Sequence, residues 1–398
     1  GSIGLSKSTI YMSQGKYIMS EESGLGVIVR KDVKAIKGGY SQFSEGTDVS
    51  ARDIDAYVTV ISGDVNGNKQ ADAGDCGLLL VKKGHIAIEG VTFQYGYVSE
   101  ADASATECGS GIYVSGSASD TFIELTDWVI RDCKSGVTTS AKQGGPAVFV
   151  LSGQVRLNKV SLLDNTAAGR GGAVRCSSKT AVVFMNGCLL KGNSHNGSWG
   201  NGIQMSEGHI CINNTTLIEN MGTGAALNGG GSILLTNNTI IGNANDSHGA
   251  VRCETGVGGD TKFINNLLIS ENPSAPSFNL NGSNFEAFSK GYNVYQRVTG
   301  ITMSASDTAY PNQVNGALNE EGVYVWDLNQ IGSVKGYATR QAVIEVAKSF
   351  NPVASPITNL GEVFVEWIGE DAFGIDQRGV TRNANKMQAG AYDAVLAN

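Results

Sequence analysis

The sequence predicts an all-β chain folded as a single-stranded parallel β-helix, a solenoid closed by caps at its N- and C-terminal ends. Three observations predict this fold. One Asn-anchored pattern recurs five times between Gly145 and Asn272, short apolar runs are separated by Asn and Gly, and Gly accounts for 53 of the 398 residues. A repeated unit of roughly 20 to 50 residues that cannot bury its own apolar face must stack on its neighbours.

Each repeat is defined by an Asn and by the residues that precede it at fixed distances. An apolar residue stands three positions before the anchor, and an Asn stands seven positions before it in four of the five repeats. Stacked coils place Asn over Asn, so that each amide bonds to the next. The anchors are Asn165, Asn193, Asn220, Asn243 and Asn272; the apolar residues are Leu162, Leu190, Leu217, Ile240 and Ile269; the residues seven positions before are Asn158, Asn186, Asn213, Thr236 and Asn265.

The apolar runs between the anchors are short and lack helical spacing. They predict about three short strands per coil, each giving alternate side chains to a shared interior. Tight turns join the strands, because Asn and Gly tolerate left-handed backbone angles. The alternative is a β-sandwich, whose short strands recur at similar spacing. The Asn register across five units favours the β-helix.

The chain divides into three regions. Residues 1–75 are irregular and strand-like, and we expect them to form the N-terminal cap and first coils, because an open solenoid end exposes strand edges. Residues 76–295 hold the repeats, and residues 296–398 form an irregular C-terminal region in which the segment from Ser355 to Asp393 is expected to cap the end. Within that region the stretch from Thr339 to Phe350 is predicted to be a helix with Thr339 as its cap.

Composition and cysteine usage restrict the partners and the location of the protein. The net charge is −8 without a Lys/Arg run, which argues against nucleic acid, and no apolar stretch is long enough for a membrane span. We expect a monomer outside the cell or on its surface, with its leader removed before residue 1. Cys176 and Cys253 recur in Val-Arg-Cys and indicate small apolar core residues, whereas Cys76 and Cys108 are the pair to test for a disulfide.

One outward-pointing residue per coil can be aligned in the strand that opens each repeat. Side chains alternate along a strand, so the residue between two inward apolar positions points away from the core. Aromatic and Arg side chains in one column suit a sugar chain, since sugar rings stack on aromatic faces and guanidinium groups bind carboxylates and hydroxyls. The alternative is an ordinary mixed solvent face. The column consists of Tyr113, Phe149, Arg175, Gln204 and Arg252, with Arg170, Trp199 and His248 at its rim.

The loop from Asp64 to Asp75 is a second candidate site. Oxygen-bearing side chains fall at the spacing of a calcium loop, and calcium is the only cofactor that the sequence suggests. Lys69 stands where such loops have Gly, Asp75 replaces the usual Glu, and no flanking helices are predicted. A polar turn is therefore the alternative. The candidate ligands are Asp64, Asn66, Asn68, Asp72 and Asp75.

Two further segments carry a family resemblance. Ile61 to Asn68 reads Ile-Ser-Gly-Asp-Val-Asn-Gly-Asn, and the tail holds Asp376-Gln377-Arg378-Gly379, Arg382 and Gly390-Ala391-Tyr392-Asp393. Together with the Asn-anchored repeat, they resemble the bacterial secreted and cell-surface proteins with right-handed parallel β-helix repeats, the pectin-lyase-like architecture. In that group a Ser-Gly-Asp-x-x-Gly-Asn segment precedes the repeats and an Asp-x-x-Gly-x-x-Arg…Gly-Ala-Tyr signature follows them. The resemblance implies a right-handed β-helix in a secreted or surface protein.

The same resemblance makes pectate lyases and polygalacturonases the enzymes to test. The polygalacturonase motifs are absent; Ser247-His248-Gly249 comes nearest and has no Asp-Asp partner. Arg175 and Arg252 are candidate lyase bases without a clustered Asp set beside them. We therefore expect a protein that binds a polysaccharide or a surface glycan without cleaving it. The alternatives are a polysaccharide lyase or glycoside hydrolase with an unrecognised site, and a structural adhesin whose protein partner docks on an exposed apolar patch.

Overall fold

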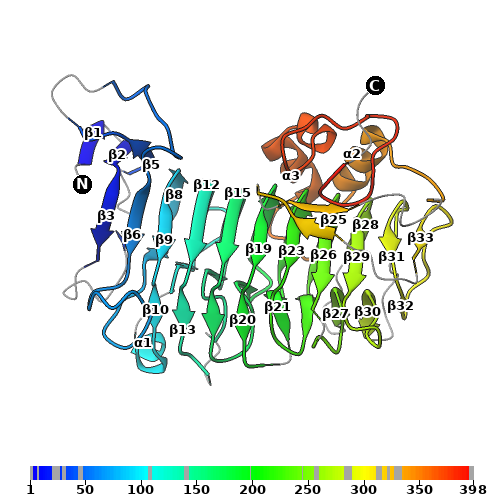
Figure 1. Cartoon of the computed structure of the whole chain (residues 1–398), viewed down its shortest axis with the longest axis horizontal. Helices are drawn as coiled ribbons and strands as arrows, with labels where there is room; N and C mark the ends of the chain where they lie inside the picture. The colour runs from blue at the N-terminus through cyan, green and yellow to red at the C-terminus, as the bar shows by residue number, and fades with distance from the viewer. Residues whose placement is uncertain are drawn as a thin grey trace.

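The computed structural model shows a chain built mostly of strands, which pair in parallel along long sheets (Figure 1). This arrangement is compatible with a β-helix. No helix in the described ranges has the length and apolar character needed to cross a membrane. The described residues are 3–6, 9–19, 27–28, 33–43, 48–105, 110–138, 143–197, 199–243, 245–254, 260–281, 289–310, 316–320, 323–326 and 334–393.

The largest sheet contains two columns of strands, which β12 and β15 join because each runs through both columns. The first column is β1 (Ile3–Ser6), β2 (Thr9–Ser13), β5 (Ala35–Tyr40), β8 (Gly84–Glu89), β12 (Thr121–Arg131), β15 (Gly153–Leu163), β18 (Ala181–Asn186), β22 (His209–Asn213), β25 (Ser232–Thr236) and β28 (Thr261–Ile264). The second column adds β3 (Gly15–Ile18), β6 (Thr59–Ser62), β9 (Thr92–Gln94), β19 (Leu189–Lys191), β23 (Thr216–Ile218), β26 (Thr239–Gly242), β29 (Leu267–Ser270), β31 (Val294–Tyr295) and β33 (Thr308–Ala309).

Most of the remaining parallel strands form two smaller sheets, one of ten strands and one of four. One consists of β4 (Val27–Ile28), β7 (Leu79–Val81), β11 (Ile112–Val114), β14 (Val148–Val150), β17 (Val174–Cys176), β21 (Gly200–Met205), β24 (Ala225–Gly229), β27 (Val251–Glu254), β30 (Phe278–Asn281) and β32 (Val298–Thr299), and we call it the opening sheet. The other consists of β10 (Tyr97–Val98), β13 (Lys134–Ser135), β16 (Thr166–Ala167) and β20 (Ser194–His195). Antiparallel pairing joins β1 to β2 and β34 (Gly316–Leu318) to β35 (Tyr324–Trp326).

The interior is a single apolar core that runs through the stacked strands. Val174 and Cys176 are completely buried in this core, and Cys253 is 2% exposed, which confirms the cysteines as small core residues. The apolar stack in the second column is Leu162, Leu190, Leu217, Ile240 and Leu268.

The sequence-based alignment is wrong by one residue in the last repeat, where Ile240 pairs with Leu268 rather than with Ile269. Ile269 instead packs in a cluster outside the main core. The equivalent of Asn243 is consequently Glu271, since Gly242 pairs with Ser270. In this repeat the Asn spacing therefore differs from the strand register by one residue.

The expected asparagine ladder is present at the turn between the two columns. Asn186 Nδ2 donates to Asn158 Oδ1 at 3.0 Å, and Asn213 Nδ2 donates to Asn186 Oδ1 at 2.9 Å. In the next coil the ladder moves to Asn237, which donates to Asn213 at 2.9 Å and accepts from Asn265 at 2.8 Å. Because Asn237 occupies the ladder in this coil, position 236 does not require Asn and holds Thr.

A residue with positive φ lies at this turn in successive coils, as tight turns require. Its identity varies: Lys159 (φ 54), Gly187 (φ 63), Asn214 (φ 54), Asn237 (φ 58) and Asn265 (φ 59). In the first three of these coils the ladder Asn immediately precedes the left-handed residue, whereas in the last two Asn237 and Asn265 occupy the ladder and the turn at once.

The segment from Arg340 to Asp393 packs on the flank of the large sheet, whereas the sequence predicted that Ser355 to Asp393 caps the end of the stack (Figure 1). The helices of this region are α2 (Arg340–Lys348), α3 (Leu360–Ile368) and a 3₁₀ turn, η3 (Glu370–Gly374). A further helix, α1 (Glu100–Ala105), lies after β10. Thr339 caps α2 as predicted, accepting a hydrogen bond from Ala342 N at 3.1 Å. Residues of α2, α3 and η3 cover outward apolar side chains of β18, β22, β25 and β28: Val182, Phe184, Cys211, Leu234 and Ile264.

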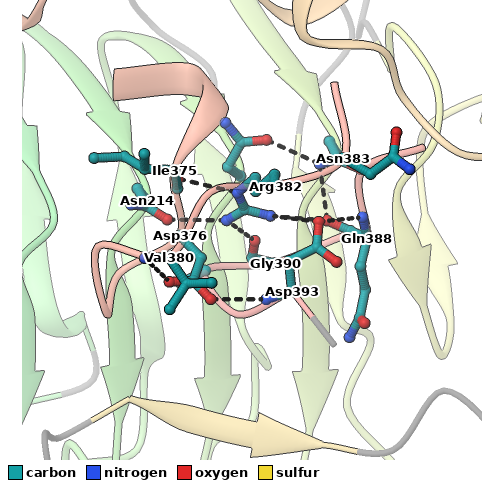
Figure 2. Close-up of polar contacts among 12 residues, drawn as sticks. Asn214, Ile375, Asp376, Val380, Arg382, Asn383, Gln388, Gly390 and Asp393 are labelled. Atoms are coloured by element: carbon teal, nitrogen blue, oxygen red, sulfur yellow. Dashed lines mark hydrogen bonds and ion pairs between the residues drawn. The ribbon is translucent and has the colours of Figure 1, made fainter. Parts of the chain in front are cut away.

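The tail motif fixes this cover to the turns of the large sheet (Figure 2). Arg382 is completely buried and donates to Asn214 Oδ1 at 3.0 Å and to Gly390 O at 2.9 Å. Asp376 pairs with Arg378, and Ala391 N donates to Thr239 Oγ1 at 3.0 Å. The charged residues of the signature therefore have structural partners, which offset the cost of their burial.

Candidate functional site

The predicted column has the expected register in the opening sheet. Tyr113 pairs with Phe149, Phe149 with Arg175, and Arg175 with Gln204. The column continues through Asn228 to Arg252, so Asn228 is a member that the predicted column did not include.

Four of the five predicted column residues are buried, however, and for these four the expectation of a solvent-facing groove is wrong; Arg252 is partly buried, with 14% of its side chain exposed. Tyr113 is 1% exposed, Phe149 2%, Gln204 4% and Arg175 7%. Tyr113 and Phe149 stack at 5.2 Å within a small apolar cluster that also contains Leu80. These aromatic rings therefore have no open face on which a sugar can stack.

Glycine-rich segments that precede the strands close over the column. A Cβ on Gly145 would lie 3.0 Å from Arg175 Cβ and 3.2 Å from Phe149 Cα, and a Cβ on Gly171 would lie 3.2 Å from Gln204 Cβ. Gly200 N also donates to Gln204 Oε1 at 2.7 Å. Only glycine permits this close approach of backbone to side chain, so the many glycines of the sequence indicate the cover.

Both arginines of the column contact other groups of the protein. Arg175 Nη1 donates to Gln143 O, its guanidinium lies 5.5 Å from the centre of the Phe149 ring, and burial lowers its pKa to about 10. Arg252 forms an ion pair with Glu254 at 3.1 Å. Both groups therefore stabilise the local packing of the opening sheet.

The three rim residues remain reachable from solvent, together with two hydroxyl residues of the same loops. The Arg170 side chain is exposed and its guanidinium lies 4.8 Å from the centre of the half-buried Trp199 ring. Thr223 Oγ1 donates to Gly197 O at 3.2 Å, and Ser247 Oγ donates to Thr223 O at 2.7 Å. We call this run over four successive coils the loop strip: Arg170, Trp199, Thr223, Ser247 and His248.

His248 is neutral in this setting, and its tautomer follows from its neighbours. Ser247 Oγ gives its only hydrogen to Thr223 O and lies 2.7 Å from His248 Nδ1. His248 Nδ1 therefore donates to Ser247 Oγ, and Nε2 is the unprotonated nitrogen. Partial burial and then the charge of Arg252 lower the pKa of His248, which leaves an acceptor nitrogen on the strip at neutral pH.

A buried polar group beneath the loop strip was missed by the sequence analysis. His195 Nε2 lies 2.8 Å from Asn201 Oδ1, and Asn201 Nδ2 donates to Asp246 Oδ1. Asp246 is completely buried, and burial raises its pKa to about 8. The sequence signal was weak, because His195 and Asn201 stand in one Gly- and Asn-rich loop and Asp246 stands singly in another.

The loop from Asp64 to Asp75 is organised by its own hydrogen bonds. Asp64 pairs with Lys16 at 3.0 Å, Asp75 Oδ1 accepts from Val65 N at 2.9 Å, and Asp72 Oδ1 accepts from Asn66 Nδ2 at 2.9 Å. Within the described ranges, no group of three or more His, Cys, Asp or Glu side chains is placed to hold a metal ion. The loop therefore has the geometry of a polar turn, which was the alternative to a calcium loop.

A cleft of about 350 Å³ lies elsewhere, on the helical cover. Its lining is mainly acidic and comes from α2, α3 and η3: Lys348, Glu362, Val365, Glu366, Gly369 and Glu370. None of the predicted site residues contributes to it. Of the pair Cys76 and Cys108, which the sequence marks for a disulfide test, Cys108 lies outside the described residues.

Comparison of the chain with protein-family models, with curated proteins and with solved structures finds no match in any of the three.

Proposed function

We propose that the chain is a right-handed parallel β-helix of the pectin-lyase-like kind, secreted or surface-exposed, that binds a polysaccharide or surface glycan along the loop strip without cleaving it. The parallel register from coil to coil and the asparagine ladder support the architecture. The resemblance of the tail motif to that of secreted and cell-surface proteins supports the location outside the cell or on its surface. The proposed glycan contacts are therefore the residues of the loop strip and not the buried column.

The pairing of the exposed Arg170 with the half-buried Trp199 carries the proposal. An indole ring supplies a flat apolar face for a sugar ring, and a guanidinium supplies donors for hydroxyl or carboxylate oxygens. Thr223 and Ser247 add hydroxyls on the next coils, and His248 Nε2 adds an acceptor. These are the polar and aromatic groups that a glycan requires.

The dimensions of the strip fit a short oligosaccharide segment. Strands in neighbouring coils are separated by about 4.8 Å. Arg170 and His248 precede β17 and β27, which are three steps apart in the opening sheet. The strip therefore spans roughly 14 Å at that spacing, so it contacts a few consecutive sugar units.

Binding is favoured over cleavage because the ionisable groups nearest the strip already have partners. Arg252 is paired with Glu254. Asp246 is buried, and its two oxygens accept from Asn201 Nδ2 and from Asn243 N, the latter at 2.7 Å. A hydrolase that inverts configuration needs two facing carboxylates about 6.5–9.5 Å apart with room for water, and neither Asp246 nor Glu254 is presented in that way.

The test is a glycan array with the intact protein, followed by titration of the tightest binder. We expect the double variant Arg170→Ala/Trp199→Ala to lose at least about tenfold in affinity, because Trp and Arg side chains supply a large share of the energy of binding interfaces. Lys179→Ala is the matched control, since it removes an exposed cation that follows β17 outside the strip. An acidic glycan should bind more weakly at high salt, whereas a neutral glycan should show little salt effect.

Two outcomes would refute the proposal. Unchanged affinity in the double variant would move the site away from the strip. New reducing ends or unsaturated sugars after incubation with the binder would show cleavage and establish a lyase or hydrolase instead.

A further inference from the structure

The loop that carries Trp199 is closed by a hydrogen bond between its two ends. Gly197 N donates to His195 Nδ1 at 2.9 Å, so the hydrogen of the neutral imidazole is on Nε2. His195 Nε2 then donates to Asn201 Oδ1 at 2.8 Å. Burial lowers the pKa of His195, which keeps the ring neutral. Trp199 therefore lies on a short loop whose two ends are tied by one side-chain contact.

The same hydrogen-bond chain continues to the loop that carries Ser247 and His248. Because the Asn201 oxygen accepts from His195, its amide nitrogen must donate, and the acceptor is Asp246 Oδ1. Asp246 Oδ2 accepts from Asn243 N at 2.7 Å. The chain therefore has one direction, from the imidazole of His195 through the amide of Asn201 to the carboxyl group of Asp246.

Burial makes this chain rigid. His195 is 5% exposed, and Asn201 and Asp246 are completely buried. A buried polar group that loses its partner is costly, so the three side chains hold one another in place. The coil between them contributes Gly222, where a Cβ would lie 2.2 Å from Asn201 Oδ1 and 2.9 Å from His195 Nε2. Glycine at this position leaves room for the contact.

We infer that His195, Asn201 and Asp246 are positioning residues that hold Trp199 and His248 in a fixed relation for the glycan. This inference rests on the proposed function of the loop strip. Ordering a binding loop before the ligand arrives removes that cost from association. Loss of the chain should therefore weaken binding although none of the three residues contacts the ligand.

The experiment combines histidine NMR with glycan titration on the intact protein. The chain has four histidines, which makes the imidazole signals of His195 and His248 assignable. Asn201→Ala removes the middle of the chain. Gly222→Ala disrupts it by steric contact while every polar group is retained, and provides a second route if Asn201→Ala fails to fold. Asn245→Ala is the matched control, an exposed Asn beside Asp246.

In the wild type we expect the Hε2 proton of His195 to be protected from solvent exchange. Both chain-breaking variants should lose that signal and shift the resonances of His248 and of the Trp199 indole. Affinity for the array binder should fall roughly 5- to 150-fold, as expected for two side chains that must be ordered on binding. Asn245→Ala should change none of these.

The positioning role is overturned if the His195 signal is lost while the His248 and Trp199 signals and the affinity stay at wild-type values. It is also overturned if wild-type His195 exchanges its proton freely. Failure of the wild type to bind any glycan would refute the proposed function separately, and the NMR shifts would still decide whether the chain links the two loops.

Discussion

Substitution of Phe364 by Ala tests whether the helical cover is held on the large sheet by apolar packing. Phe364 is completely buried, with its ring centre 5.2 Å from Phe184 of β18 and 6.1 Å from Trp367. Truncation of a buried Phe costs about 3–5 kcal/mol. If this cost destabilises only the docked cover, the population of the undocked state rises between roughly 100- and 4,000-fold, since each 1.4 kcal/mol is a factor of ten.

Cys211 provides the readout, because it lies in the same cluster under the cover and is completely buried. Burial raises the pKa of its thiol well above the ordinary value, so it reacts only after the cover opens. The assay is maleimide labelling under native conditions, with mass spectrometry of the Cys211 peptide. Cys253, which is buried in the main core, is the internal reference.

The expected result is faster labelling at Cys211 with an unchanged rate at Cys253. Val353→Ala is the control, because that side chain is fully exposed and its truncation should change neither rate. Equal acceleration at both cysteines would show that the cover and the strand stack unfold together. An unchanged rate at Cys211 would show that Phe364 does not hold the cover. Either result would refute the reasoning.

Three further predictions concern stability. Leu217→Ala should cost about 2–5 kcal/mol in urea unfolding, because Leu217 is completely buried between Leu190 and Ile240; a cost below about 1 kcal/mol would contradict the stacked core. Millimolar calcium should leave the melting temperature unchanged, because the carboxylates of Asp72 and Asp75 already accept hydrogen bonds within their loop; a rise of several degrees would re-establish the calcium loop. Burial lowers the pKa of His209 in the folded state, so its contribution to stability is present above about pH 6.5 and is lost as the pH falls below it. His209→Gln should therefore flatten the fall in stability between about pH 7 and 5, and an unchanged slope would contradict this. The contribution of Asp246 to stability has the opposite pH dependence. Burial raises the pKa of Asp246 to about 8, so its contribution declines as the pH rises towards that value.

The strand register and the inward-pointing residues of most coils could be predicted from the sequence. Leu162, Leu190, Leu217 and Ile240 stack as predicted, because alternation along a strand and repetition between strands are both local properties. The pattern failed where the strand register shifted by one residue, at Ile269. A one-residue slip moves a side chain to the opposite face, and the Asn anchor gave no indication of it.

Which segments cover the outward faces of the strands could not be predicted in the same way. β18 offered one readable signal, because its residues Ala181 to Met185 are all apolar and do not alternate with polar residues. Such a run is typical of a strand that is covered on both faces, and Phe184 is indeed covered by Phe364. The helix α3 that provides this cover was not anticipated, and the tail was assigned to the wrong surface of the stack.

The sequence by itself determined which residues lie side by side along the stack, because that depends on short repeats and on the geometry of one strand. It thereby determined the order of Tyr113, Phe149, Arg175 and Gln204 in their column. Only the tertiary structure decided which of these side chains meet solvent. Gly145 folds back over Arg175, and α3 reaches β18 from far along the chain. Burial depends on contacts between distant segments, which no local pattern encodes, so the candidate site moved from the column to the loops beside it.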